Sequence, residues 1–182
     1  MSITSADLNP TPMSLHTGRL ILRPPAAQDW PAFRDFYASD RSAGVGGPKT
    51  EGPAWRHFAA ELGHWQIHGF GMWAVTQRGS DECLGMIGPW CPADWPENEV
   101  GWMIFSDAIE GTGIATEAAR AAIAHAFGGL GWDTVVSYVA PDNTRSARLV
   151  EKLGAELDPN APVPAAYPET LVYRHPKPGV AT

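Results

Sequence analysis

Cysteine, basic side chains and long apolar runs are all scarce in this sequence. The two cysteines, Cys83 and Cys91, are too few for a disulfide scaffold and are not spaced like a metal site. Thirteen Lys and Arg against 20 Asp and Glu leave a net charge of −7, which argues against a general nucleic-acid binder. No uncharged apolar run reaches the ~18 residues of a transmembrane helix. Residues 1–12 also lack the basic start and apolar centre of a signal peptide. We therefore expect a cytoplasmic protein with no nucleic-acid or membrane partner.

The length and composition favour one folded domain. A chain of 182 residues can bury a large core without disulfide bonds or structural metals, and 44% hydrophobic residues exclude wholesale disorder. Polar and proline-containing ends predict a loose N-terminal arm over 1–14 and a frayed C-terminal tail over 176–182. The domain itself should span 15–175.

Hydrophobic periodicity predicts alternating strands and helices along this domain. We expect strands at 19–23, 70–77, 82–88, 98–105, 134–139, 155–157 and 169–174. Helices should begin near Asp29 and then run over 53–68, 112–127 and 143–153. This order indicates an α/β (mixed α+β) domain: a single mixed, mostly antiparallel sheet of six to seven strands with helices on both faces.

The 53–68 helix carries two stripes of side chains at helical spacing. One is apolar and should face the core: Trp55, Phe58, Leu62 and Trp65. The other has the residue types of a metal site: His57, Glu61, His64 and His68. The two stripes are offset by two residues, about 200°, so the second should face solvent and we expect no bound metal.

Glycines open the 112–127 helix in a way that suits a diphosphate. Gly111 and Gly113 let the backbone approach a ligand closely, and the first turn of a helix leaves N–H groups unpaired with a partial positive charge. A Walker A loop is ruled out because the sequence has no Gly-Lys-Ser/Thr. A dinucleotide fingerprint fits poorly as well. It would need Gly or Ala in place of Thr116, and its first glycine would follow the strand almost directly, whereas here Ser106–Glu110 lie between them.

Four segments in the right order carry a family resemblance. They are Thr17–Arg23 (TGRLILR), Glu99–Met103 (EVGWM), Glu110–Ala118 (EGTGIATEA) and Asn143–Gly154 (NTRSARLVEKLG). With these segments the chain resembles the GCN5-related N-acetyltransferase (GNAT) superfamily, particularly the branch that includes the ribosomal-protein N-terminal acetyltransferases. The resemblance covers about residues 17–174. It implies the GNAT fold, with acetyl-CoA as cosubstrate and no metal.

The resemblance also implies which residues hold acetyl-CoA. The pantetheine would pair with backbone groups of Met103, Ile104 and Phe105 on the central strand, and Asn143 would reach the pantetheine arm. The pyrophosphate would lie on the N–H groups of Gly111, Thr112, Gly113, Ile114, Ala115 and Thr116. One position departs from the family, which usually has Gln or Arg at Glu110. A carboxylate there should weaken diphosphate binding without abolishing it.

Direct acetyl transfer to an amine needs a base for the ammonium proton and an acid for the leaving thiolate. The resemblance offers Glu99 as the base, with Glu169 and Asp94 as rivals. Ser146, one helical turn beyond Asn143, would protonate the CoA sulfur. Some members of the superfamily use a tyrosine as the acid, but we expect Tyr138 to lie in the core. Glu99, Ser146 and Asn143 form the predicted catalytic set.

Two functions follow from this interpretation. The first is an N-acetyltransferase that moves an acetyl group directly to a primary amine, either a peptide N-terminus or a small-molecule amine. The alternative is a catalytically idle acyl-CoA-binding module. The acceptor should lie among the 41–52, 89–97 and 158–168 loops, where Trp90 and Trp95 could form one wall. The sequence leaves open the acceptor and the choice between monomer and homodimer.

Overall fold

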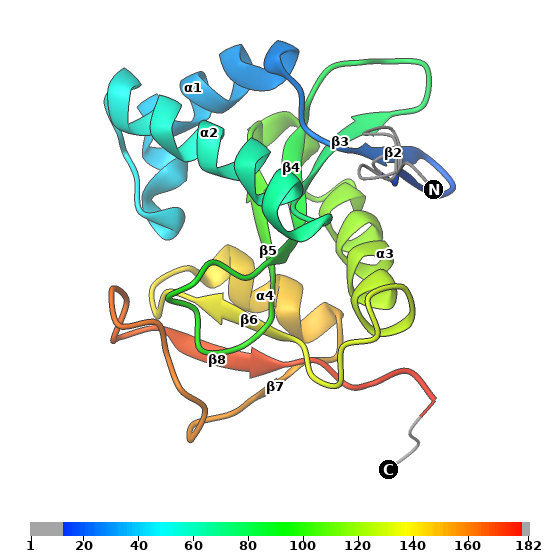
Figure 1. Cartoon of the computed structure of the whole chain (residues 1–182), viewed down its shortest axis with the longest axis vertical. Coiled ribbons are helices and arrows are strands. Elements are labelled where there is room, and N and C mark those ends of the chain that lie inside the picture. The colour runs from blue at the N-terminus through cyan, green and yellow to red at the C-terminus, as the bar shows by residue number, and fades with distance from the viewer. Residues whose placement is uncertain (1–12, 180–182) are drawn as a thin grey trace, which may run out of the picture.

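The computed structural model describes residues 13–179, which fold around one eight-stranded sheet with strand order β1-β2-β3-β4-β5-β6-β8-β7 (Figure 1). The strands are β1 (Leu15–His16), β2 (Leu20–Arg23), β3 (Trp73–Gln77), β4 (Gly85–Trp90), β5 (Glu99–Ile104), β6 (Val136–Val139), β7 (Glu156–Leu157) and β8 (Leu171–Arg174). Every neighbouring pair is antiparallel except β5 and β6. The mixed, mostly antiparallel sheet is therefore confirmed.

The strand count is one or two higher than predicted. The additional strand, β1, is two residues long and pairs with β2 through Leu15 opposite Leu22. Two residues are too few to show the alternation that marks a strand in a sequence. Residues 1–12 of the expected arm over 1–14, and residues 180–182 of the expected tail over 176–182, lie outside the described residues.

Four helices cover the two faces of the sheet: α1 (Trp30–Ala38), α2 (Glu51–His68), α3 (Ile114–Gly128) and α4 (Thr144–Lys152). The helices α1 and α2 pack together on one face, against Met72, Ala74 and Met86. The helix α3 packs on the other face, where it also contacts α4 (Figure 1). Between residues 13 and 179, no helix combines the length and the apolar character that a membrane span needs.

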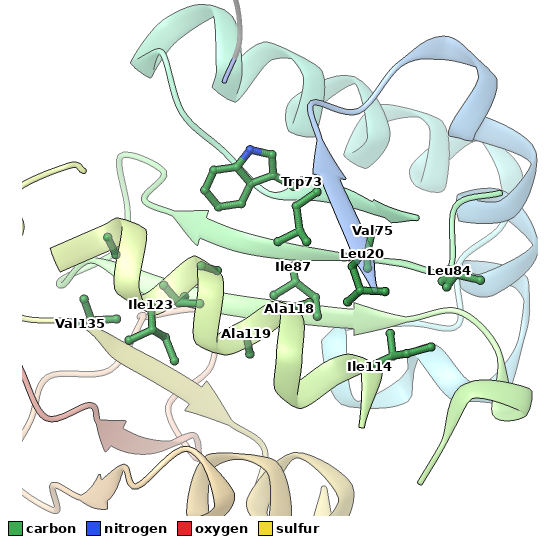
Figure 2. Close-up of a cluster of buried hydrophobic side chains, with 14 of the residues drawn as sticks. Leu20, Trp73, Val75, Leu84, Ile87, Ile114, Ala118, Ala119, Ile123 and Val135 are labelled. Atoms are coloured by element: carbon green, nitrogen blue, oxygen red, sulfur yellow. The ribbon is translucent and has the colours of Figure 1, made fainter. Parts of the chain in front are cut away.

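Small side chains let α3 lie close to the sheet. Ala118, Ala119 and Ala122 are fully buried, and they face the strand residues Leu20 and Ile87 (Figure 2). An alanine helix face brings the helix backbone near the strands, so the start of α3 is held firmly beside the end of β5. The alanine face of α3 thus forms a close helix–sheet interface.

The buried face of α2 differs from the prediction. Trp55 is 58% exposed, whereas Glu61 and His64 are only 1% and 4% exposed. The buried arc runs through Ala54, Phe58, Glu61 and Trp65, so it lies between the two predicted stripes. The expectation that the histidine and glutamate stripe faces solvent was therefore wrong for Glu61 and His64, whereas His68 is exposed as expected. Periodicity misplaced the arc because it assumes that only apolar residues are buried.

The sheet is interrupted between its two parallel strands. β5 and β6 pair only at Glu99 and Val136, and beyond that point they separate. The Ser137 hydroxyl donates to the Val100 carbonyl at 2.6 Å, replacing a ladder hydrogen bond with a side-chain one. The buried His175 lies 2.9 Å from the same hydroxyl, and burial lowers its pKa to about 4. Ser137 and the neutral His175 thus fix the point where the strands separate.

Because the alanine face of α3 packs closely on the sheet, a larger side chain on that face should destabilise the protein. Ala118→Leu should lower the free energy of unfolding by about 1–3 kcal/mol, because the extra atoms have no space against the sheet. Ala124→Leu, at an exposed position of the same helix, should leave stability nearly unchanged. Chemical denaturation of both variants measures the difference, and equal stabilities would contradict the packing described here.

Candidate active site

A cavity of about 510 Å³ runs through the sheet where β5 and β6 separate. Its lining includes His57 and Glu61 of α2 on one face of the sheet and Ser146 of α4 on the other. Trp90 and Trp95 also line it, and their role as an acceptor wall stays a prediction. A path from one face to the other exists only because the two strands are not paired there.

Glu99, the first residue of β5, lies in the wall of this cavity and is 8% exposed. The indole N–H of Trp95 donates to its Oε2 at 2.5 Å. Burial raises the pKa of Glu99 to about 7, although the hydrogen bonds from Trp95 and the Tyr138 backbone oppose the shift. A carboxylate with a pKa near neutrality is suited to accept and release protons.

The two rival carboxylates have different surroundings. Asp94 lines the cavity but is exposed to solvent. Glu169 is exposed and is not part of the cavity wall. Only Glu99 combines burial with a position on the central strand, so the geometry favours it over both rivals.

Asn143 and Ser146 lie together at the start of α4, as predicted. The Asn143 Oδ1 accepts the backbone N–H of Ser146 at 3.1 Å and so caps the helix. The Ser146 Oγ accepts the Trp102 indole N–H at 3.0 Å. Because an indole can only donate, the serine hydroxyl keeps its own hydrogen available. Both residues line the cavity.

Tyr138 does not lie in the core as expected. It is half-buried and lines the cavity, and its hydroxyl is buried without a partner among the described residues. Its ring packs against Trp95, which in turn contacts Tyr167. Alternation along β6 turns Ser137 toward Val100 and therefore turns Tyr138 toward the cavity.

The open edge of β5 exposes backbone groups of alternate residues. The Phe105 N–H donates to Leu84 and Met103 lies opposite Met86, so the backbone groups of Met103 face β4. Ile104, and Trp102 before it, face the edge that β6 leaves free. This corrects the predicted backbone role of Met103 and Phe105: of the three residues named, only Ile104 presents its backbone at the gap.

The turn before α3 has the predicted cradle geometry. Gly111 and Gly113 have φ values of 74° and 82°, a left-handed conformation that favours glycine. Gly113 is the N-cap of α3, so the N–H groups of Ala115 and Thr116 have no partner within the helix. The Arg19 guanidinium donates to the Thr112 carbonyl at 2.9 Å and pairs with Glu117 at 2.7 Å, which fixes the turn.

Two arginines neutralise Glu110. Its carboxylate lies 2.9 Å from Arg41 and 3.3 Å from Arg145. Arg41 also pairs with Asp107 and donates to the Ile104 carbonyl from two nitrogens at 3.3 Å each. No sequence motif pointed to Arg41, which lies in the irregular 3-10 segment Asp40–Val45. The departure from the family at Glu110 is thus compensated by charge on neighbouring elements.

The histidine stripe has a structural use. The Cys91 N–H donates to the His64 Nε2 at 3.1 Å, so Nδ1 carries the proton and donates to the Phe70 carbonyl at 2.8 Å. Burial lowers the pKa of His64, in keeping with this neutral tautomer. No group of three or more His, Cys, Asp or Glu residues within 13–179 is arranged to hold a metal ion.

Comparison with known proteins agrees with this site. The family described as acetyltransferase (GNAT) domain matches residues 19–156. The chain belongs to the GNAT family. It is therefore an acyltransferase, and the family to which it belongs uses acetyl-CoA.

Solved GNAT structures share the fold. An acetyltransferase from Agrobacterium tumefaciens is 44% identical, with a TM-score of 0.84, over 90% of this chain and 94% of that chain. RimJ from Mycobacterium smegmatis, solved with CoA-disulfide, is 20% identical, with a TM-score of 0.63, over 85% of this chain and 80% of its own. A ribosomal-protein-S5-alanine acetyltransferase from Vibrio fischeri is 14% identical, with a TM-score of 0.66, over 93% of this chain and 100% of its own. The last two show likeness of fold to the ribosomal-protein branch.

The turn geometry of this GNAT domain predicts a glycine requirement. Gly113→Ala should weaken CoA binding by at least about tenfold, because a non-glycine residue in this conformation costs roughly 1–2 kcal/mol and its Cβ would lie 3.3 Å from the Arg19 Nη2. Gly128→Ala, at the end of the same helix and with open space around it, should bind CoA normally. Calorimetric titration with CoA measures both, and equal affinities would contradict the cradle assignment.

Proposed function

We propose that this protein is an acetyl-CoA-dependent N-acetyltransferase that moves an acetyl group directly to a primary amine. The observation that carries the proposal is the buried Glu99, with a pKa near 7, in a cavity that continues through the sheet to Ser146. The acceptor amine would enter from the side of α2 and the Trp90 and Trp95 loop. The thioester would lie at the gap between β5 and β6.

Glu99 is the base in this proposal. An amine is mostly an ammonium at neutral pH, so it must lose a proton before it can attack a carbonyl. The Glu99 carboxylate accepts the Trp95 indole N–H through Oε2, and its two oxygens have further lone pairs that can accept that proton. A pKa of about 7 means that the group is ionised in a substantial fraction of molecules when the amine arrives.

Ser146 is the acid. Its hydroxyl accepts from Trp102, which polarises the O–H bond and directs the hydrogen away from the indole. Asn143 fixes the backbone of the same turn, so the hydroxyl is presented from a rigid helix start. Proton donation from this position would stabilise the departing thiolate.

The residues present fit acetyl-CoA, which supplies an acetyl group activated as a thioester. The turn from Gly111 to Thr116 offers unpaired N–H groups and a helix dipole to the diphosphate. The Ile104 N–H and the backbone of Trp102 lie at the unpaired edge of β5, where an amide-containing arm can form hydrogen bonds. Arg41 and Arg145 offset the Glu110 charge beside the turn.

The general test is thiol release from acetyl-CoA across a panel of peptide N-termini and small amines. Turnover that needs both acetyl-CoA and an amine, with mass-spectrometric detection of the acetylated product, supports the proposal. Saturable acetyl-CoA binding without turnover on any amine would instead support the idle acyl-CoA-binding module.

Glu99 predicts the pH dependence of kcat. The base works only when deprotonated, so with saturating acceptor kcat should rise about tenfold per pH unit below pH 7 and level off above the pKa of about 7. Glu99→Gln should lower kcat by about 10²–10⁴-fold and remove this limb. Measurements of kcat over a series of pH values, for the wild type and the variant, test both effects. A variant that keeps the wild-type profile would exclude Glu99 as the base.

If Ser146 is the acid, removing its hydroxyl should lower kcat with little change in the KM for acetyl-CoA. Ser146→Ala should slow turnover by about 10- to 100-fold, a modest effect because a thiolate leaves without strong assistance. Ser146→Thr keeps the hydroxyl and should recover much of the rate. Tyr138→Phe tests the other unpaired hydroxyl in the cavity. If Tyr138→Phe alone slows turnover, the acid is Tyr138 and not Ser146.

A further inference from the structure

A second carboxylate, Glu61, faces the same cavity and has no part in the mechanism described above. It lies on the middle of α2, is 1% exposed and contributes to the cavity wall. A glutamate inside a helix–sheet interface is unusual, since ionisable side chains are almost never fully buried without a partner. Its position therefore calls for an explanation.

The hydrogen bonding of Glu61 is incomplete. Its Oε1 lies 3.5 Å from the Nε2 of His57, one helical turn earlier. Its Oε2 is buried and has no hydrogen-bond partner among the described residues. A buried carboxylate oxygen without a donor is costly, and it becomes favourable only when a donor reaches it. Glu61 is part of the cavity wall, so a donor bound in the cavity can approach its side chain.

The charges around the cavity favour a cation as this donor. Three carboxylates, from Glu61, Asp94 and Glu99, line the cavity, and His57 joins them. Lys49 is the permanent cation of the lining, and its Nζ donates to the Gly46 carbonyl at 2.7 Å. Burial raises the pKa of Glu61, and Glu61 in turn raises the pKa of Glu99. A cation against the free oxygen of Glu61 would relieve both costs.

The walls of the cavity also suit a cation. Trp90 and Trp95 contribute aromatic rings to the lining, and the faces of such rings attract positively charged groups. The Tyr37 ring in the same lining already lies 4.3 Å from the Lys49 ammonium. An acceptor with a carboxylate or phosphate at the same end would meet Glu61 and be repelled. The lining therefore discriminates by charge at a point separate from the reacting amine.

We propose that Glu61 binds a second cationic nitrogen of the acceptor, so that the preferred substrates of this acetyltransferase are diamines. The inference rests on the proposed N-acetyltransferase activity and adds the substrate class. One amine of the diamine is deprotonated by Glu99 and acetylated, while the other remains an ammonium that donates to Glu61 Oε2.

The test compares straight-chain α,ω-diamines of increasing length with the monoamine and the ω-amino acid of the same carbon count. In the wild-type protein kcat/KM should be highest for a diamine of matching length and lowest for the amino acid. The advantage over the monoamine should be about 10- to 100-fold, the range of a hydrogen bond to a charged group. This comparison needs no variant, so it does not depend on the folding of one.

Glu61→Gln should remove the diamine advantage mainly through KM. The readout is the ratio of diamine to monoamine kcat/KM above pH 7, where Glu99 is mostly deprotonated in both proteins. Glu51→Gln, at an exposed position on the same helix, should keep the advantage and serves as the matched control. Equal kcat/KM for diamine and monoamine in the wild type, or an unchanged ratio in Glu61→Gln, would overturn the inference while the acetyltransferase activity stands. Absence of transfer to every amine would instead refute the proposed function itself.

Discussion

The separation of β5 and β6 is the constraint on which the rest of the site depends. Paired along their length, these strands would close the sheet, and α2 and α4 could not contribute to one cavity. The separation is stabilised locally, because the Ser137 hydroxyl satisfies the Val100 carbonyl that a neighbouring strand would otherwise satisfy. The neutral His175 completes this arrangement from the buried side. Side-chain hydrogen bonds at a single point, around Ser137, thus stabilise the separation of β5 from β6.

The same geometry determines the chemistry of Glu99. It is the last β5 residue paired with β6, so it is buried by the intact part of the sheet and still reaches the open part. Burial raises the pKa of its carboxyl to about 7, while Trp95 limits the shift by donating to it. One residue before Glu99, Asn98 already lies outside the strand.

Much of the fold was predictable from the sequence because periodic burial and glycine positions are local signals. The helix bounds of α2, α3 and α4 agree within a few residues, and the turn at Gly111 and Gly113 has the expected conformation. The failures concern buried polar groups. Glu61 lies in the cavity wall, and the buried His64 bonds the backbone of Cys91 and Phe70. No hydrophobic pattern encodes either position. Arg41 was missed because its contact with Ile104 spans 63 residues of sequence.

The charges around the α3 N-terminus show why the Glu110 departure is tolerated. A carboxylate beside a diphosphate site would oppose binding if it were unpaired. Here Arg41 and Arg145 pair with Glu110, and Arg19 pairs with Glu117 in the first turn of the helix. Because a guanidinium has five N–H donors, Arg41 can serve Ile104, Asp107 and Glu110 together. The acidic side chains next to the turn are therefore balanced, and the helix dipole with its free N–H groups remains the dominant field there.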